Sequence, residues 1–249
     1  MKIVVCIKRT PDTETRLRLG EGGVSIDPNG VKFIISPYDE FALEAGLQIK
    51  EAVGEGEVTL LSMGGDETQE TLRQGLAMGA DQAVLLTGEA GVDGLATAKA
   101  LAAELKEMGP ALILFGMKGG DMDQQQVGPM TATLLDLPCA TAVSEFELAG
   151  DTLTCRREVE GGAEIMEMNL PAVITIAKGK FEPRYASLKG IMAAKRKPLD
   201  AKEAQGGASR LIVRDMAYPP ERPAGRVVGE GPDAAPELVR LLREEAKTL

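Results

Sequence analysis

Residues 111–135 read ALILFGMKGGDMDQQQVGPMTATLL and contain a strand, a loop and the start of a helix in succession. The apolar run 111–115 is typical of a buried strand, and the apolar positions after Pro129 predict a helix. Residues 116–128 between them are polar and rich in glycine, which lets backbone approach a ligand closely. In an open parallel sheet, such a loop lies beyond the carboxyl end of its strand, where ligands bind. This stretch therefore predicts a fold class and a ligand site together.

The preceding part of the chain repeats this alternation of strand and helix. Apolar runs predict strands at residues 3–7, 58–63 and 83–86, and helical periodicity predicts helices after Ser36, from Asp66 and over about 93–108. Ser36 and Pro37 form a typical helix start, and Asp66 opens a variant of the capping box. The alternation predicts an α/β fold with a doubly wound, mainly parallel sheet.

The pattern changes after about residue 140. Extended segments at 141–148, 152–158 and 164–168 predict an antiparallel extension at the edge of the main sheet, and 172–177 returns as an apolar strand. The C-terminal part is rich in proline, glycine and charge, and it has too little apolar surface for a core of its own. We therefore divide the chain into an α/β domain, 1–198, and a C-terminal arm, 199–249, that lies on a partner; a disordered tail is the alternative.

The composition excludes several classes of function. The 249 residues contain no histidine and no tryptophan, and 28 basic against 38 acidic residues give a net charge of −10. Imidazole bases and ligands are therefore absent, and an acidic chain poor in aromatic residues is unlike a nucleic-acid-binding surface. Cys6, Cys139 and Cys155 are far apart, which predicts neither a disulfide framework nor a zinc site. Without a signal-like segment or an apolar run of about 18 residues, we expect a soluble cytoplasmic protein.

Three loops qualify for the ligand site, at residues 8–13, 63–65 and 116–128. Neither a P-loop nor a Rossmann fingerprint is present, so the prediction depends on position in the fold. The glutamines at 124–126 lie where the next helix must begin, and the free N–H groups of a helix start favour phosphate. A polar surface loop is the alternative. Asp121 and Asp123 alone are a weak case for a metal site, because no other acidic residue converges on them in the sequence.

The segment 181–192, FEPRYASLKGIM, places a proline, an aromatic residue and apolar residues just before the basic triplet at 195–197. Its composition fits either a surface loop that closes onto the core or a docking loop for another protein.

Together with other landmarks, these two segments resemble the β subunit of electron transfer flavoprotein over residues 1–199. The landmarks are V-x-I-K-R from Val5 with Asp12, Gly30-Val31-Lys32 before Ser36-Pro37-Tyr38-Asp39-Glu40, residues 76–81 (LAMGAD), D-x-D-x-x-Q-x-G from Asp121, Arg157-Glu158 with Gly161-Gly162, residues 170–173 (LPAV), and E-P-R-Y-A-x-L from Glu182 with Ile191-Met192.

The resemblance implies a heterodimer with an α subunit that holds most of a redox-active FAD, while β supplies one wall of the flavin site and binds AMP. It also implies the adenine nucleotide α-hydrolase type of fold and a C-terminal arm over the partner. The matching cofactor-binding residues are Cys6, Ser36, Tyr38, Asp39, Met63, Gly116, Asp121, Asp123, Gln124, Gln125, Gln126, Val127, Gly128 and Thr131 at the nucleotide, with Thr13 and Glu158 near the flavin.

The resemblance further implies an electron carrier without catalytic residues of its own. It would accept electrons from acyl-CoA or other flavin dehydrogenases and pass them to an electron transfer flavoprotein–quinone oxidoreductase. The matching partner-binding residues are Arg184, Tyr185, Leu188, Ile191 and Met192, with Leu188 as the anchor.

Some positions depart from the AMP-binding pattern. Ser36 and Gln125 stand where many AMP-binding relatives have asparagine, and residues 126–129 resemble the electron-bifurcating branch, whose β subunit binds a second FAD and uses NADH. Met122, however, stands where that branch has glycine, and the segment 38–40 resembles the non-bifurcating branch. We expect AMP, with a second FAD as one alternative and a stand-alone nucleotide-binding enzyme of the same fold as another.

Overall fold

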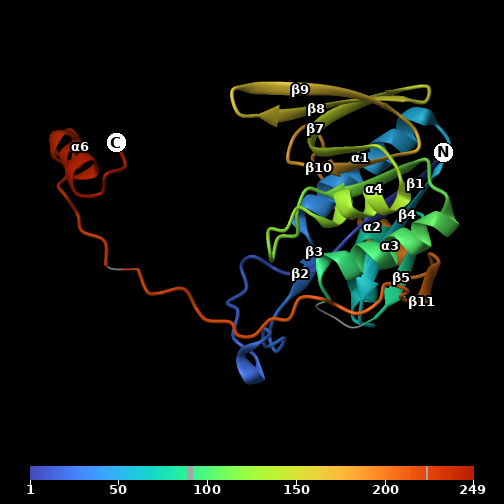
Figure 1. Ribbon diagram of the computed structural model, residues 1–249, viewed down its shortest axis with the longest axis horizontal. Helices are drawn as coiled ribbons and strands as arrows, with labels where there is room; N and C mark the ends of the chain where they lie inside the picture. Colours follow the sequence, from blue (N-terminus) through green and yellow to red (C-terminus); the bar gives the residue numbers. More distant parts are fainter. Residues whose placement is uncertain (89–91, 223) are drawn as a thin grey trace.

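A computed structural model describes residues 1–88, 92–222 and 224–249 (Figure 1). Its main sheet has nine strands in the order β11-β5-β4-β1-β6-β10-β7-β8-β9. The strands are β1 (Lys2–Cys6), β4 (Glu57–Gly64), β5 (Gln82–Thr87), β6 (Leu112–Gly116), β7 (Cys139–Ala149), β8 (Thr152–Val159), β9 (Gly162–Asn169), β10 (Ala172–Ile176) and β11 (Leu199–Glu203). The six strands from β11 to β10 pair in parallel, which confirms the predicted α/β fold.

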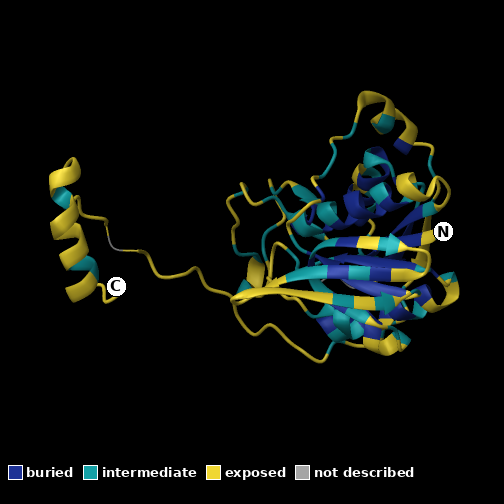
Figure 2. Cartoon of the chain, turned by 90° about the horizontal axis from the view of Figure 1, so that it is seen from above, coloured by how far each residue is buried: buried dark blue, intermediate teal, exposed yellow. Residues whose placement is uncertain are grey.

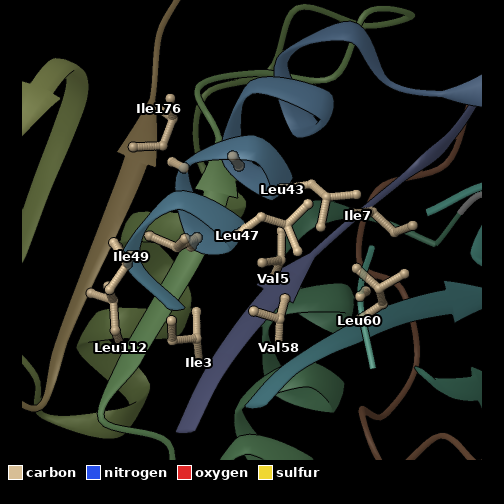
Figure 3. Close-up of a cluster of buried hydrophobic side chains, with 14 of the residues drawn as sticks. Ile3, Val5, Ile7, Leu43, Leu47, Ile49, Val58, Leu60, Leu112 and Ile176 are labelled. Atoms are coloured by element: carbon tan, nitrogen blue, oxygen red, sulfur yellow. The ribbon is translucent and has the colours of Figure 1, made fainter. Parts of the chain in front are cut away.

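Helices cover both faces of the sheet. On one face lie α1 (Pro37–Val53) and α2 (Thr68–Met78), and on the other lie α3 (Gly94–Met108) and α4 (Val127–Leu135). Successive residues of β1 point to opposite faces, so Ile3 and Val5 pack under α1, as Figure 3 shows, whereas Val4 and Cys6 pack toward α3 and α4. The continuously apolar strands predicted from the sequence are therefore buried on both sides.

The strand order reverses next to β1. From β1 the chain builds outward through β4 to β5, and then crosses to β6 on the other side of β1. Connections on the two sides of β1 run over opposite faces, so a crevice opens beyond the carboxyl ends of β1 and β6.

Strands β7, β8 and β9 form the predicted antiparallel extension. They join the main sheet through β7, which pairs in parallel with β10. The expectation of an extension at the edge of the sheet is confirmed.

Three details differ from the predictions or were missed. Helix α2 begins at Thr68 with Glu67 as its N-cap residue, so the capping box proposed from Asp66 is wrong. Strand β11, which we placed in the arm, pairs with β5 in the main sheet, so the chain leaves the sheet only after Glu203. The short antiparallel sheet of β2 (Arg9–Pro11) and β3 (Phe33–Ile35) was not predicted.

The rest of the C-terminal part extends away from the sheet. The beginning of this part is fixed by Asp93, the N-cap residue of α3. The Asp93 carboxylate accepts hydrogen bonds from the backbone N–H groups of Arg210 and Leu211, as well as from that of Ala96 in α3. Beyond Leu211, the described residues before η2 (Pro232–Ala234) are almost all exposed, and η2 and α6 (Ala235–Glu244) lie apart from the sheet (Figures 1 and 2). Among the described residues, no helix has the length and apolar character needed to cross a membrane.

Candidate functional site

A cavity of about 290 Å³ lies at the carboxyl ends of β1, β4 and β6. The three loops selected from the sequence meet there. Predicted site residues in its wall are Cys6, Asp39, Met63, Gly116, Asp121, Gln124, Gln125, Gln126, Val127 and Gly128. The wall also contains Lys8, Arg9 and Lys118 from the selected loops, and Gly94 and Thr97 from α3, which the sequence did not indicate.

Asp39, in the first turn of α1, ties together the two strands that flank the crevice. Its carboxylate accepts a hydrogen bond of 2.7 Å from the backbone N–H of Lys8, after β1, and one of 2.9 Å from Gly116, at the end of β6. The side chain is buried. Asp39 thus fixes the width of the crevice at its base.

Burial also changes the protonation of Asp39. It raises the pKa of the carboxyl from 3.8 to about 7, although the N–H groups of Lys8 and Gly116 act in the opposite direction. Burial likewise raises the pKa of the Cys6 thiol, so Cys6 is a neutral wall residue and not a nucleophile.

The raised pKa of Asp39 predicts a pH dependence of stability. A folded-state pKa above the unfolded one stabilises the fold below the unfolded value, and this contribution is lost as pH rises through the folded value. We therefore expect the free energy of unfolding of the wild type, relative to Asp39→Asn, to fall between about pH 4 and about pH 7. Urea unfolding of both proteins across this range measures it; a difference independent of pH would contradict the assignment.

Ser36 and Tyr38 do not line the cavity, but they contact the glycine-rich loop 116–128. The buried Ser36 hydroxyl accepts a hydrogen bond of 3.1 Å from the N–H of Gly120, although the residue also stands at the N-cap of α1. The Lys118 ammonium lies 5.6 Å from the centre of the Tyr38 ring. Both residues therefore support the loop.

Two ion pairs stabilise this loop. Lys8 pairs at 2.7 Å with Asp121, and both residues line the cavity. Lys118, which also lines it, pairs at 2.8 Å with Asp123, which does not. Each aspartate thus has a lysine partner. In the described residues, no group of three histidine, cysteine, aspartate or glutamate side chains could hold a metal ion.

Helix α4 points its first turn at the cavity. The side chain of its N-cap residue, Gln126, makes no capping hydrogen bond to the helix, and residues 126–128 line the cavity wall. Thr131 is buried and donates a 2.8 Å hydrogen bond to the carbonyl oxygen of Val127, so it stabilises this turn and does not reach the cavity. The free N–H groups of the turn can bind an anion, and the apolar wall from Cys6, Met63 and Phe115 can hold a flat ring.

Thr13 and Glu158 lie outside the cavity. Thr13 is exposed after β2, and Glu158 is exposed on β8, where it pairs with Arg156. The structure does not bring them together with the nucleotide-type site.

Residues 184–192 expose several apolar side chains and lead into α5 (Leu188–Ala194); we call them the docking segment, after the docking loop that the sequence allows. Tyr185 is 99% and Leu188 is 83% exposed, and Ile191 and Met192 are exposed beside them. The Ser187 hydroxyl caps α5 by accepting a 3.1 Å hydrogen bond from Gly190 N–H. Arg184 differs, because it forms ion pairs with Glu44 and Glu51 of α1.

Comparison with known proteins gives a consistent result. The family described as "Electron transfer flavoprotein domain" matches residues 24–205. The electron transfer flavoprotein subunit beta of Bacillus subtilis is 39% identical over 260 residues, with all of both chains covered. That of Syntrophomonas wolfei is 36% identical and covers 99% of this chain and 98% of its own. The mitochondrial subunit beta of Arabidopsis thaliana is 37% identical, with 99% of each chain covered.

These matches cover most or all of the chain, and they confirm the resemblance drawn from the motifs. The chain belongs to the electron transfer flavoprotein β-subunit family.

Proposed function

We propose that this chain is the β subunit of a heterodimeric electron transfer flavoprotein that binds AMP in its own cavity and forms one wall of an FAD site. It carries electrons from acyl-CoA or other flavin dehydrogenases to an electron transfer flavoprotein–quinone oxidoreductase. The bound flavin supplies the redox chemistry, and this chain's residues bind and orient. The names of its relatives, which are flavoprotein β subunits, support this proposal.

The observation that carries the AMP assignment is the cavity at the switch point. Its volume of about 290 Å³ is at the lower end of the range for small-molecule sites, which favours a mononucleotide over the larger FAD. The N–H groups at the start of α4 and the ammonium of Lys8 suit a phosphate, and Met63 and Phe115 suit an adenine ring. The bifurcating alternative, with a second FAD and NADH, is supported by residues 126–129 of the sequence alone.

Two further surfaces are consistent with a heterodimer. Thr13 and Glu158 are exposed outside the cavity, as residues that face a flavin held by an α subunit must be. The arm exposes Leu211 and Ile212 as well as Leu238 and Val239 of α6, a set of apolar side chains that an α subunit would cover.

Co-expression with its α subunit tests the proposal. We expect a yellow complex that elutes as a heterodimer and contains FAD, whereas the chain expressed alone remains colourless, because most flavin contacts belong to α. A stable, colourless chain that binds neither α nor flavin, or one that turns over ATP by itself, would contradict the proposal.

A further inference from the structure

The docking segment is anchored at its N-terminal end by one arginine. Arg184 forms a bidentate ion pair with Glu44, in which Nε donates to Oε2 at 2.8 Å and Nη2 donates to Oε1 at 2.9 Å. Nη1 donates to Glu51 Oε1 at 2.6 Å. The backbone N–H of Arg184 also donates to Glu44 Oε2, at 3.2 Å. Side chain and backbone are thus fixed to the same helix, α1.

This contact is stronger than an ordinary surface ion pair. The Glu44 side chain is only 4% exposed. Burial by itself would raise the pKa of Glu44, but hydrogen bonds from Arg184 and Gln48 outweigh it, and the net pKa lies below the ordinary value. Glu44 therefore stays charged and needs its cation, because an uncompensated charge at a buried position is unfavourable.

The chain directly after the docking segment is held against α2. Arg73 Nη1 donates to the carbonyl oxygens of Ala194 at 2.6 Å and Lys197 at 2.7 Å. Gly190 packs against the carbonyl oxygen of Ala77 so closely that a Cβ there would clash. Helix α5 therefore rests directly on α2, and its apolar residues project outward between two fixed ends.

We propose that Arg184 is a positioning residue. It does not contact the partner dehydrogenase itself, but it holds Leu188 in the geometry that the dehydrogenase binds. This inference rests on the proposed docking function. All three guanidinium nitrogens already donate to Glu44 or Glu51. A segment of mainly exposed apolar residues loses less conformational entropy on binding when it is fixed beforehand.

A double-mutant cycle tests the proposal on the intact heterodimer. Arg184→Gln, Leu188→Ala and the double variant are assayed for electron transfer from a purified acyl-CoA dehydrogenase, with the heterodimer as varied substrate. We expect Arg184→Gln to raise the apparent KM by about tenfold, with kcat and FAD content unchanged. In the Leu188→Ala background the same substitution should have no further effect, because the residue it positions is gone.

Two variants control for general loss of structure. Lys202 on β11 is the ion-pair partner of another buried glutamate, Glu104 on α3. Lys202→Gln removes that partner and should leave KM unchanged. Arg184→Lys keeps the positive charge but cannot form the bidentate contact with Glu44, so we expect a KM between those of the wild type and Arg184→Gln.

An equal rise in KM from Arg184→Gln in both backgrounds would overturn the inference, as would a KM that does not change. If Arg184→Gln does not assemble, Glu51→Gln replaces it in the cycle, because Glu51 is the exposed partner and Glu44 keeps its cation. A KM unchanged in Glu51→Gln would then overturn the inference. If Leu188→Ala alone has no effect, the docking function fails and the inference fails with it.

Discussion

Replacing Leu188 with alanine is expected to reduce electron transfer from a partner dehydrogenase by about 30-fold below saturation, which corresponds to about 2 kcal/mol of binding energy. Leu188 projects from the start of α5 and is almost fully exposed, so its apolar surface remains in water until a partner covers it. Flavin and AMP content should not change, because the docking segment contributes nothing to the wall of the nucleotide cavity.

Stopped-flow reduction of the heterodimer by an acyl-CoA dehydrogenase measures this effect. Leu134→Ala is the matched control, because Leu134 is also an exposed leucine but lies on α4, on the opposite face of the sheet from α1 and α2. Loss of flavin together with activity in Leu188→Ala would show that the segment is structural.

Replacing Gly116 with alanine is expected to destabilise the protein by about 3 kcal/mol and to remove bound AMP. An added Cβ would lie 2.6 Å from the Tyr38 carbonyl carbon and 2.7 Å from the Asp39 backbone nitrogen. Neither backbone atom can move without displacing the start of α1. The substitution would therefore separate β6 from Asp39 and break the hydrogen bond that fixes the cavity.

Gly120→Ala is the matched control in the same loop, because Gly120 does not line the cavity. There an added Cβ meets only side-chain atoms, with Pro37 Cδ at 3.2 Å and Ser36 Oγ at 3.9 Å. Urea unfolding and mass spectrometry of nucleotides released by heat compare the two variants. Equal AMP content in Gly116→Ala and wild type would contradict the proposed site.

The core of the fold could be predicted because its strands are apolar along their whole length. β11 was missed for the opposite reason: its sequence LDAKE is mostly exposed at the edge of the sheet and shows no apolar run. The start of α2 was misplaced because Asp66 has the right residue type, but the chain becomes helical only at Thr68.

The site was predictable where it depends on strand ends and not where it depends on packing. Parallel strands deliver their loops to one edge, so the loops after β1, β4 and β6 had to meet. Gly94 and Thr97 of α3 reach the same cavity through tertiary packing, which no local pattern indicates. From the sequence we expected Arg184 to bind a partner protein. Its contacts with Glu44 and Glu51 could not be predicted, because they join residues 140 and 133 positions apart in the sequence.

The most direct test of the account is the identity and stoichiometry of the nucleotides released from the purified heterodimer. One FAD and one AMP per heterodimer are expected, with AMP lost in Gly116→Ala while the docking variant Leu188→Ala retains both. Two FAD molecules per heterodimer, or one FAD without AMP, would contradict the assignment of the cavity.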